Sequence, residues 1–209
     1  MKLSAKYRAL VAHLYDRSLE GAENKYFQEQ RRKVVETVSG TVLELGAGTG
    51  ANLPYYQPKL LQKLVLTEPD EFMLQKLSQK TGRYRLPLEY LQVGAENLPF
   101  PNASFDYVVT TLVLCSVGDL AKSLAEVRRV LKPGGELRFF EHVRAEGRIS
   151  VGLQTIITPL WKVCAVGCHL NRDTYAAIEK AGFRTNGFSP SRVMRVTIFP
   201  FITGTAISS

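Results

Sequence analysis

Apolar residues recur at helical spacing near the start of the chain. One stripe consists of Leu3, Tyr7, Leu10, Val11 and Leu14. A second stripe runs through residues 26–38 and ends before Gly40. This spacing predicts two amphipathic helices, which together form an N-terminal helical cap over residues 1–39.

Short apolar runs then alternate with helical patterns. The predicted strands cover residues 41–45, 64–67, 86–93, 105–111, 136–141, 183–188 and 193–207. The predicted helices cover residues 71–80 with Asp70 as N-cap, residues 120–131 before Pro133, and residues 176–181 with Asp173 or Asn171 as N-cap. Such alternation predicts an α/β fold, a doubly wound Rossmann-like sheet with helices on both faces.

The first predicted strand runs into a glycine-rich turn, Glu44-Leu-Gly-Ala-Gly-Thr-Gly50. Glycine lets the backbone turn sharply at the end of a strand and approach a ligand closely. Glu68 follows the next strand, at about the 20-residue spacing from Gly46 at which an acid binds the ribose of an adenosine cofactor. The loop alone leaves the rest of the cofactor open, because a dinucleotide fits the same pattern.

Two features argue against a dinucleotide. A dehydrogenase normally needs a further substrate domain with an acid–base residue, and this chain ends soon after one sheet. The charge of Glu44, two residues before the first glycine, is also unfavourable to a pyrophosphate. We expect one domain over residues 1–209, in which a cofactor-binding core at 40–142 precedes an apolar substrate-cap segment at 143–170 and a C-terminal helix and strand pair at 171–209.

Composition narrows the classes of protein. The chain has 209 residues, 45% hydrophobic and 22% charged, as in ordinary soluble globular proteins. Its formal net charge of +8 admits nucleic acid, an anionic membrane or anionic substrates as partners. Three cysteines do not make a disulfide framework, and charges interrupt the first 17 residues. We therefore expect a cytoplasmic protein without a secretion signal or membrane anchor.

Five motifs in a fixed order resemble those of class I S-adenosylmethionine-dependent methyltransferases. They are the glycine loop, Glu68, Ala95-Glu-Asn-Leu-Pro-Phe100, Phe105-Asp106 and Leu131-Lys-Pro-Gly-Gly135. Within that superfamily, Thr111-Leu-Val-Leu-Cys-Ser-Val117 and Gly167-Cys-His-Leu-Asn-Arg-Asp-Thr174 resemble the methyltransferase-like seven branch, whose members methylate alkyl thiols. The resemblance implies a seven-stranded sheet with the last strand antiparallel and with the N-terminal helices over the cofactor.

The resemblance also implies which residues hold the cofactor, S-adenosylmethionine. The methionine end would meet the glycine loop and the end of the fourth strand, and the ribose would meet Glu68. Many relatives have an aspartate where Gly94 stands, so a backbone carbonyl or Glu96 would accept the adenine amino group here. The candidates are Glu44, Gly46, Ala47, Gly48, Gly50, Asn52, Glu68, Pro69, Gly94, Ala95, Glu96, Thr111 and Leu112.

Acceptor-site candidates come from three parts of the chain. Tyr15 resembles a tyrosine that covers the methionine end of the cofactor in related enzymes, and Cys115 is expected to line the site. The apolar segment 149–163 would fold over the site and offer a hydrophobic acceptor Leu153, Ile156, Ile157, Leu160 and Trp161. The alternative is a helix packed on the sheet without a ligand.

His142, after the fifth predicted strand, is a candidate general base because imidazole titrates near working pH. The alternative is a structural histidine that bonds a neighbouring carbonyl. Cys164, Cys168 and His169 lack the distant ligand pair of a zinc site, so no metal is expected.

These features favour methyl transfer to a small hydrophobic acceptor, with a thiol sulfur as the first hypothesis. A phospholipid N-methyltransferase and a quinone or small-molecule C- or O-methyltransferase are alternatives, for which the positive charge would serve a peripheral membrane contact. An RNA-binding protein and a non-catalytic cofactor sensor are further alternatives. The basic clusters at residues 31–33 and 128–129 are typical of solvated helix faces, so no specific nucleic acid is expected.

Overall fold

The computed structural model describes residues 4–185 and 199–208, without the side chains of residues 18–20, 22, 24 and 25. Its helices are α1 (Ala5–Ala22), a π-helical turn (Glu23–Phe27), α2 (Gln28–Val35), a 3-10 turn (Leu53–Tyr55), α3 (Glu71–Thr81), α4 (Leu120–Val130), α5 (Arg148–Cys164) and α6 (Thr174–Lys180). Its strands are β1 (Gly40–Leu45), β2 (Leu61–Thr67), β3 (Leu88–Leu91), β4 (Phe105–Thr111), β5 (Leu131–His142), β6 (Phe183–Thr185) and β7 (Phe201–Ser208).

The strands form a seven-stranded sheet in the order β3-β2-β1-β4-β5-β7-β6. β1 pairs in parallel with β2 and β4, whereas β7 is antiparallel to β5 and β6. The doubly wound α/β fold and the antiparallel last strand are confirmed. Because the strand order reverses between β1 and β4, their carboxyl ends open the crevice in which such sheets bind ligands.

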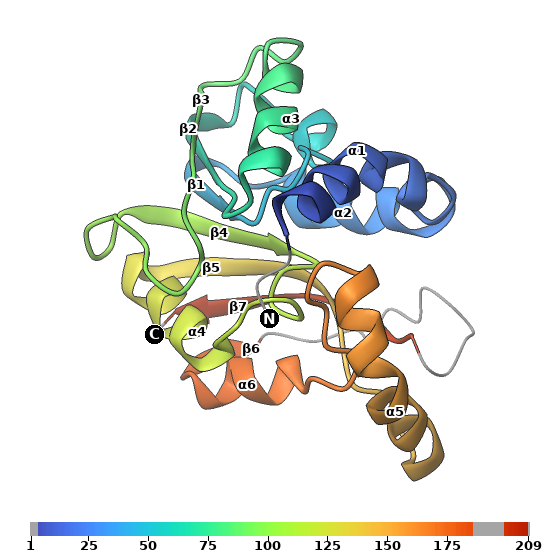
Figure 1. The fold of residues 1–209 in the computed structure, drawn as a ribbon. Coiled ribbons are helices and arrows are strands. Elements are labelled where there is room, and N and C mark those ends of the chain that lie inside the picture. Colours follow the sequence, from blue (N-terminus) through green and yellow to red (C-terminus); the bar gives the residue numbers. More distant parts are fainter. Residues whose placement is uncertain (1–3, 186–198, 209) are drawn as a thin grey trace.

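Apolar side chains cover both faces of the sheet. One layer joins the sheet to α4 and α6 through Leu43, Val108, Leu137, Leu124, Val127 and Ile178. The other joins it to α2 and α3 through Val42, Leu66, Val109, Phe140, Val34, Val35 and Leu77. Figure 1 shows these two pairs of helices on opposite sides of the sheet. Successive residues of β1 enter different layers, which places the Glu44 side chain on the face covered by α2.

Some boundaries differ from the prediction. β5 begins at Leu131 rather than at residue 136, because Leu131 already pairs with Phe105 and the register then shifts. A Cβ on Gly135 would lie 3.0 Å from the carbonyl oxygen of Asp106, so glycine permits this close pairing. β7 begins at Phe201, and the rest of the predicted strands at 183–188 and 193–207, namely residues 186–188 and 193–198, lies outside the described residues.

Helix caps follow the sequence signals in part. Asp70 accepts hydrogen bonds from the backbone N–H groups of Phe72 and Met73, as predicted. Asp173 caps α6 by accepting from Ala176, whereas Asn171 donates to Thr155 instead. Within the described residues, no helix combines the length and the apolar character needed to cross a membrane.

We expect Leu43→Ala to lower the free energy of unfolding by about 2–5 kcal/mol, because it leaves a cavity between β1 and the α4–α6 layer. Leu43 is fully buried, whereas Leu60 is 43% exposed, so Leu60→Ala should cost less than about 1 kcal/mol. Urea denaturation of both variants measures the difference. Equal losses would contradict this account of the core.

Candidate functional site

The glycine loop connects β1 to the 3-10 turn at the crevice. Gly46, Gly48 and Gly50 all have positive φ angles, which glycine adopts readily. A Cβ on Gly46 would lie 2.7 Å from Cγ2 of Val113, so this glycine lets the β4 loop approach. A Cβ on Gly48 would meet no atom within 4 Å. The backbone at Gly48 therefore borders open space, a cradle that suits the close approach of a cofactor.

Glu68 faces this cradle from the end of β2. Its carboxylate accepts hydrogen bonds of 2.9 Å from the N–H groups of Gly48 and Asp70. Burial raises the pKa of Glu68 to about 7, although these two hydrogen bonds oppose the rise. Glu68 is thus a buried acid that contacts the glycine loop directly, and its ribose-binding role stays a prediction.

Glu44 is held within the protein. Asn52 Nδ2 donates to one of its carboxylate oxygens at 2.9 Å, and the Tyr56 hydroxyl donates to the other at 2.7 Å. Burial raises the pKa of Glu44, while these two hydrogen bonds and the charge of Arg31 lower it. Both carboxylate oxygens have protein partners and Glu44 is only 2% exposed, so Glu44 supports the loop in this structure, and its direct contact with the cofactor stays a prediction.

Arg31 of α2 lies behind the same loop. Its guanidinium donates to Asn52 Oδ1 at 3.1 Å and to Thr111 Oγ1 at 2.9 Å, and it forms an ion pair with Glu23 at 2.7 Å. Asn52 also donates to Thr111 at 3.0 Å. Arg31 therefore connects α2 to the ends of β1 and β4.

The expectation that the basic cluster at residues 31–33 is a solvated face is wrong for Arg31. Arg31 is only 4% exposed, whereas the side chains of Arg32 and Lys33 are exposed. The sequence does carry the signal, because Arg31 falls on the apolar stripe, four residues after Phe27 and three before Val34.

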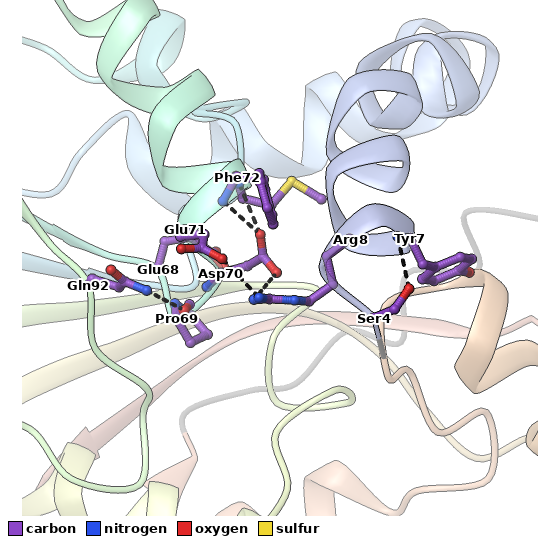
Figure 2. Close-up of polar contacts among 10 residues, drawn as sticks. Ser4, Tyr7, Arg8, Glu68, Pro69, Asp70, Glu71, Phe72 and Gln92 are labelled. Carbon is purple, nitrogen blue, oxygen red and sulfur yellow. Dashed lines mark hydrogen bonds and ion pairs between the residues drawn. The ribbon is translucent and has the colours of Figure 1, made fainter. Parts of the chain in front are cut away.

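Helix α1 crosses the site and is held by polar contacts. Arg8 forms ion pairs with Asp70 at 3.0 Å and with Glu71 at 2.9 Å, and it lies over the ring of Phe72 (Figure 2). Asp70 accepts from Arg8 through one oxygen and caps α3 through the other. These contacts fix α1 beside the turn that carries Glu68.

The far part of α1 reaches the glycine loop itself. Asp16 accepts a hydrogen bond of 2.5 Å from Thr49 Oγ1 and forms an ion pair with Lys80. Burial raises the pKa of the neighbouring Tyr15 to about 12, and the charges of Arg31 and Glu68 also act on this hydroxyl. Tyr15 therefore lies close to Arg31 and Glu68, and its contact with the methionine end of the cofactor stays a prediction.

The turn after β4 forms another wall. Leu112 has a φ of +62°, a strained value for a residue with a side chain. The buried carboxylate of Glu141 accepts from the N–H groups of Val113 and Cys115 and holds this turn. A hydrogen bond with Cys168, together with burial, raises the pKa of the Cys115 thiol well above its usual range, so Cys115 is a neutral thiol.

Residues expected near the adenine have other contacts. Glu96 accepts from the N–H groups of Gly118 and Asp119, ahead of α4. The Ala95 side chain belongs to the core layer under α4, and the Pro69 carbonyl accepts from Gln92 (Figure 2). Gly94 lies beside Glu96, whose Oε2 would be 3.1 Å from a Cβ at that position. The structure thus gives Glu96 a role in holding the turn before α4.

His142 lies in an apolar environment, in edge contact with the rings of Phe199 and Phe201. Neither ring nitrogen has a hydrogen-bond partner among the described residues, and both are buried. Burial lowers the pKa of His142 to about 4. A neutral imidazole without a polar neighbour does not suit the general-base role expected from the sequence, and that role stays a prediction.

The apolar segment forms helix α5, and its five apolar candidates differ in how far they are buried. Trp161 packs against Phe199 with ring centroids 5.0 Å apart. Ile157 is half-buried, but Leu153, Ile156 and Leu160 are exposed. The expectation that all five apolar residues face the site is thus wrong for these three. The described residues contain no cluster of side chains able to hold a metal ion.

Comparisons with known proteins agree with this architecture. Residues 43–139 match a family model described as a methyltransferase domain. The chain is 38% identical to thiol S-methyltransferase TMT1B of Rattus norvegicus over 87% of this chain and 69% of that protein. It is 33% identical to thiol S-methyltransferase TMT1A of Homo sapiens over 81% of this chain and 70% of that protein.

A solved structure also has the same fold. A chain from the complex between the Haloferax volcanii Trm112 methyltransferase activator and a methyltransferase superposes with a TM-score of 0.75. The two chains are 16% identical, and the match covers 99% of each.

The pKa of Glu68 predicts a pH-dependent affinity. If Glu68 binds the ribose, its ionised carboxylate accepts hydrogen bonds from the ribose hydroxyls, so the affinity for S-adenosylmethionine should rise by about tenfold between about pH 6 and about pH 8. Glu68→Gln should weaken binding and remove this dependence. Calorimetric titration across this range measures both effects. Glu89→Gln, on the exposed edge strand β3, is the matched control, and an unchanged pH profile in Glu68→Gln would contradict the assignment.

Proposed function

Because the chain belongs to the thiol S-methyltransferase branch of the class I S-adenosylmethionine-dependent methyltransferases, we propose that it methylates a small hydrophobic thiol. The observation that supports a thiol acceptor is how much of the chain is similar to the thiol S-methyltransferases. The methyltransferase-domain match ends at residue 139, whereas the similarity to rat TMT1B spans 87% of the chain. It therefore includes parts outside the cofactor core, where acceptors are chosen.

The site residues suit the cofactor. When bound, S-adenosylmethionine supplies a methyl group activated by a positively charged sulfonium. We propose that Glu68 binds the ribose hydroxyls and that the backbone of Gly46, Gly48 and Gly50 cradles the methionine end. The open space beside Gly48 and the buried carboxylate of Glu68 support this placement.

The acceptor is positioned from the other side of the crevice. The contributions there are the Tyr15 hydroxyl, held neutral by its raised pKa, the turn at Leu112–Cys115 and the ring of Trp161. None of these groups is charged, which favours a lipophilic acceptor over a charged metabolite. The neutral thiol of Cys115 does not compete as a nucleophile.

A thiol acceptor fits a site without a strong base. A few per cent of a cysteine-like thiol is already thiolate near neutral pH, so the protein needs chiefly to align the sulfur and the methyl group. An amine or a phenol would more often need a general base. The low pKa of His142 makes it a weak proton acceptor, consistent with a thiol as substrate.

Purified protein should transfer labelled methyl groups to alkyl thiols and not to alcohols or amines of the same chain length. The rate at low substrate concentration should rise with alkyl chain length, because the acceptor side is apolar. Mass spectrometry of the products checks both statements. Cofactor binding without turnover on any thiol would contradict the proposal, and methylation of phosphatidylethanolamine or of a quinone precursor in preference to thiols would replace it.

His142→Ala separates the two roles of this residue. If His142 removes the thiol proton, kcat/KM should fall by about 10²–10⁴-fold. We expect a loss below about tenfold, with a pH–rate profile of unchanged shape, because the imidazole is buried against aromatic rings and has no hydrogen-bond partner within residues 4–185 and 199–208. His13→Ala, at an exposed position on α1, is the matched control.

A further inference from the structure

Helix α5 is turned with its apolar face outward. Ile149, Leu153, Ile156 and Leu160 recur at helical spacing and are 83%, 45%, 76% and 72% exposed. We call these four residues the α5 stripe. Figure 1 shows the first turns of α5 projecting from the body of the protein, away from the sheet.

The opposite face of α5 is polar and buried. Gln154 is fully buried, accepts from the N–H of Ala145 at 2.8 Å and donates to the carbonyl of Val143. Thr158, 7% exposed, donates to the carbonyl of Gln154. The two Gln154 bonds tie the helix to the segment after β5 and fix its orientation, whereas the Thr158 bond lies within the helix. The outward stripe is therefore imposed by specific polar contacts, whereas a helix packed by burial alone would turn its apolar face inward.

We propose that the α5 stripe docks onto an anionic lipid bilayer. The stripe extends over twelve residues, about 16 Å along the helix axis, and is about one helix diameter wide. An area of about 160 Å² is far below the roughly 800 Å² per partner of a stable protein interface, which argues against a second copy of the chain. A single helix face of this size fits the boundary between headgroups and acyl chains, into which interfacial helices insert by about 5–10 Å.

Charge around the stripe matches an anionic surface. The segment around α5 exposes Arg144, Arg148 and Lys162 and one acid, Glu146. The formal net charge of the whole chain is +8. Basic residues that flank an inserted apolar face attract anionic headgroups and strengthen its binding.

The stripe also leads to the site. The Tyr7 hydroxyl of α1 donates to the carbonyl of Val163 in the last turn of α5, at 2.7 Å. Trp161, one residue after the end of the stripe, belongs to the acceptor side. A bilayer against α5 would thus bring dissolved lipophilic molecules next to the end of the helix that adjoins the crevice.

The test is co-sedimentation of the full chain with vesicles of phosphatidylcholine that contain about 30% phosphatidylserine. Wild type should bind them, and bind phosphatidylcholine alone more weakly. The double variant Ile149→Ser/Ile156→Ser should bind at least about tenfold more weakly, because it removes the two most exposed side chains of the stripe. Leu60→Ser, an exposed leucine at the amino ends of the strands, is the matched control and should bind as wild type does.

Three results would overturn the proposal. The first is that the wild-type protein stays in the supernatant with both kinds of vesicle. The second is that the double variant binds vesicles as the wild type does. The third is that analytical ultracentrifugation finds the wild type to be a dimer and the double variant a monomer. Circular dichroism checks that the variants are folded. Binding is measured without cofactor or thiol, so its outcome is independent of the proposed methyltransferase activity.

Discussion

The site depends on a carboxylate buried under the glycine loop. Removing an ionised acid from water is costly unless hydrogen bonds and an opposite charge compensate. Glu44 receives both, from Asn52, Tyr56 and the charge of Arg31. Arg31 in turn bonds Thr111. Removing one partner of such a network typically costs about 3–5 kcal/mol, so buried polar groups fix the relative positions of β1, β4 and α2.

The two helices of the N-terminal cap are attached to the sheet by different kinds of contact. α2 is fixed through buried groups, whereas α1 is attached through Arg8, Asp16 and Tyr7, largely at the protein surface. Exposed ion pairs contribute about 0–1 kcal/mol each, so α1 separates from the crevice at lower cost than any strand of the sheet. Because α1 carries Tyr15 and touches both Thr49 and Asp70, its attachment closes the site over the glycine loop and the Glu68 turn.

The sequence was informative wherever a local rule decided the structure. Strand alternation predicted the sheet, the glycine loop predicted the crevice, and Asp70 was identified as a cap because one side chain suffices for it. It was silent where the partner is distant in the chain. No motif indicates that Tyr56 bonds Glu44. Nothing local indicates that the rings of Phe199 and Phe201 lie against His142.

Helix α5 shows most clearly what hydrophobic periodicity in a sequence leaves undetermined. Its apolar stripe is evident in the sequence, but periodicity gives only the existence of an apolar face and not its direction. The direction is set by Gln154, whose amide bonds the backbone of Val143 and Ala145 and so turns the polar face inward. Of the five apolar residues expected to line the acceptor pocket, only Trp161 and Ile157 are half-buried. The other three, Leu153, Ile156 and Leu160, are exposed on the outward face of α5, so the orientation of the helix leaves a smaller apolar surface for the proposed acceptor than the sequence pattern suggested.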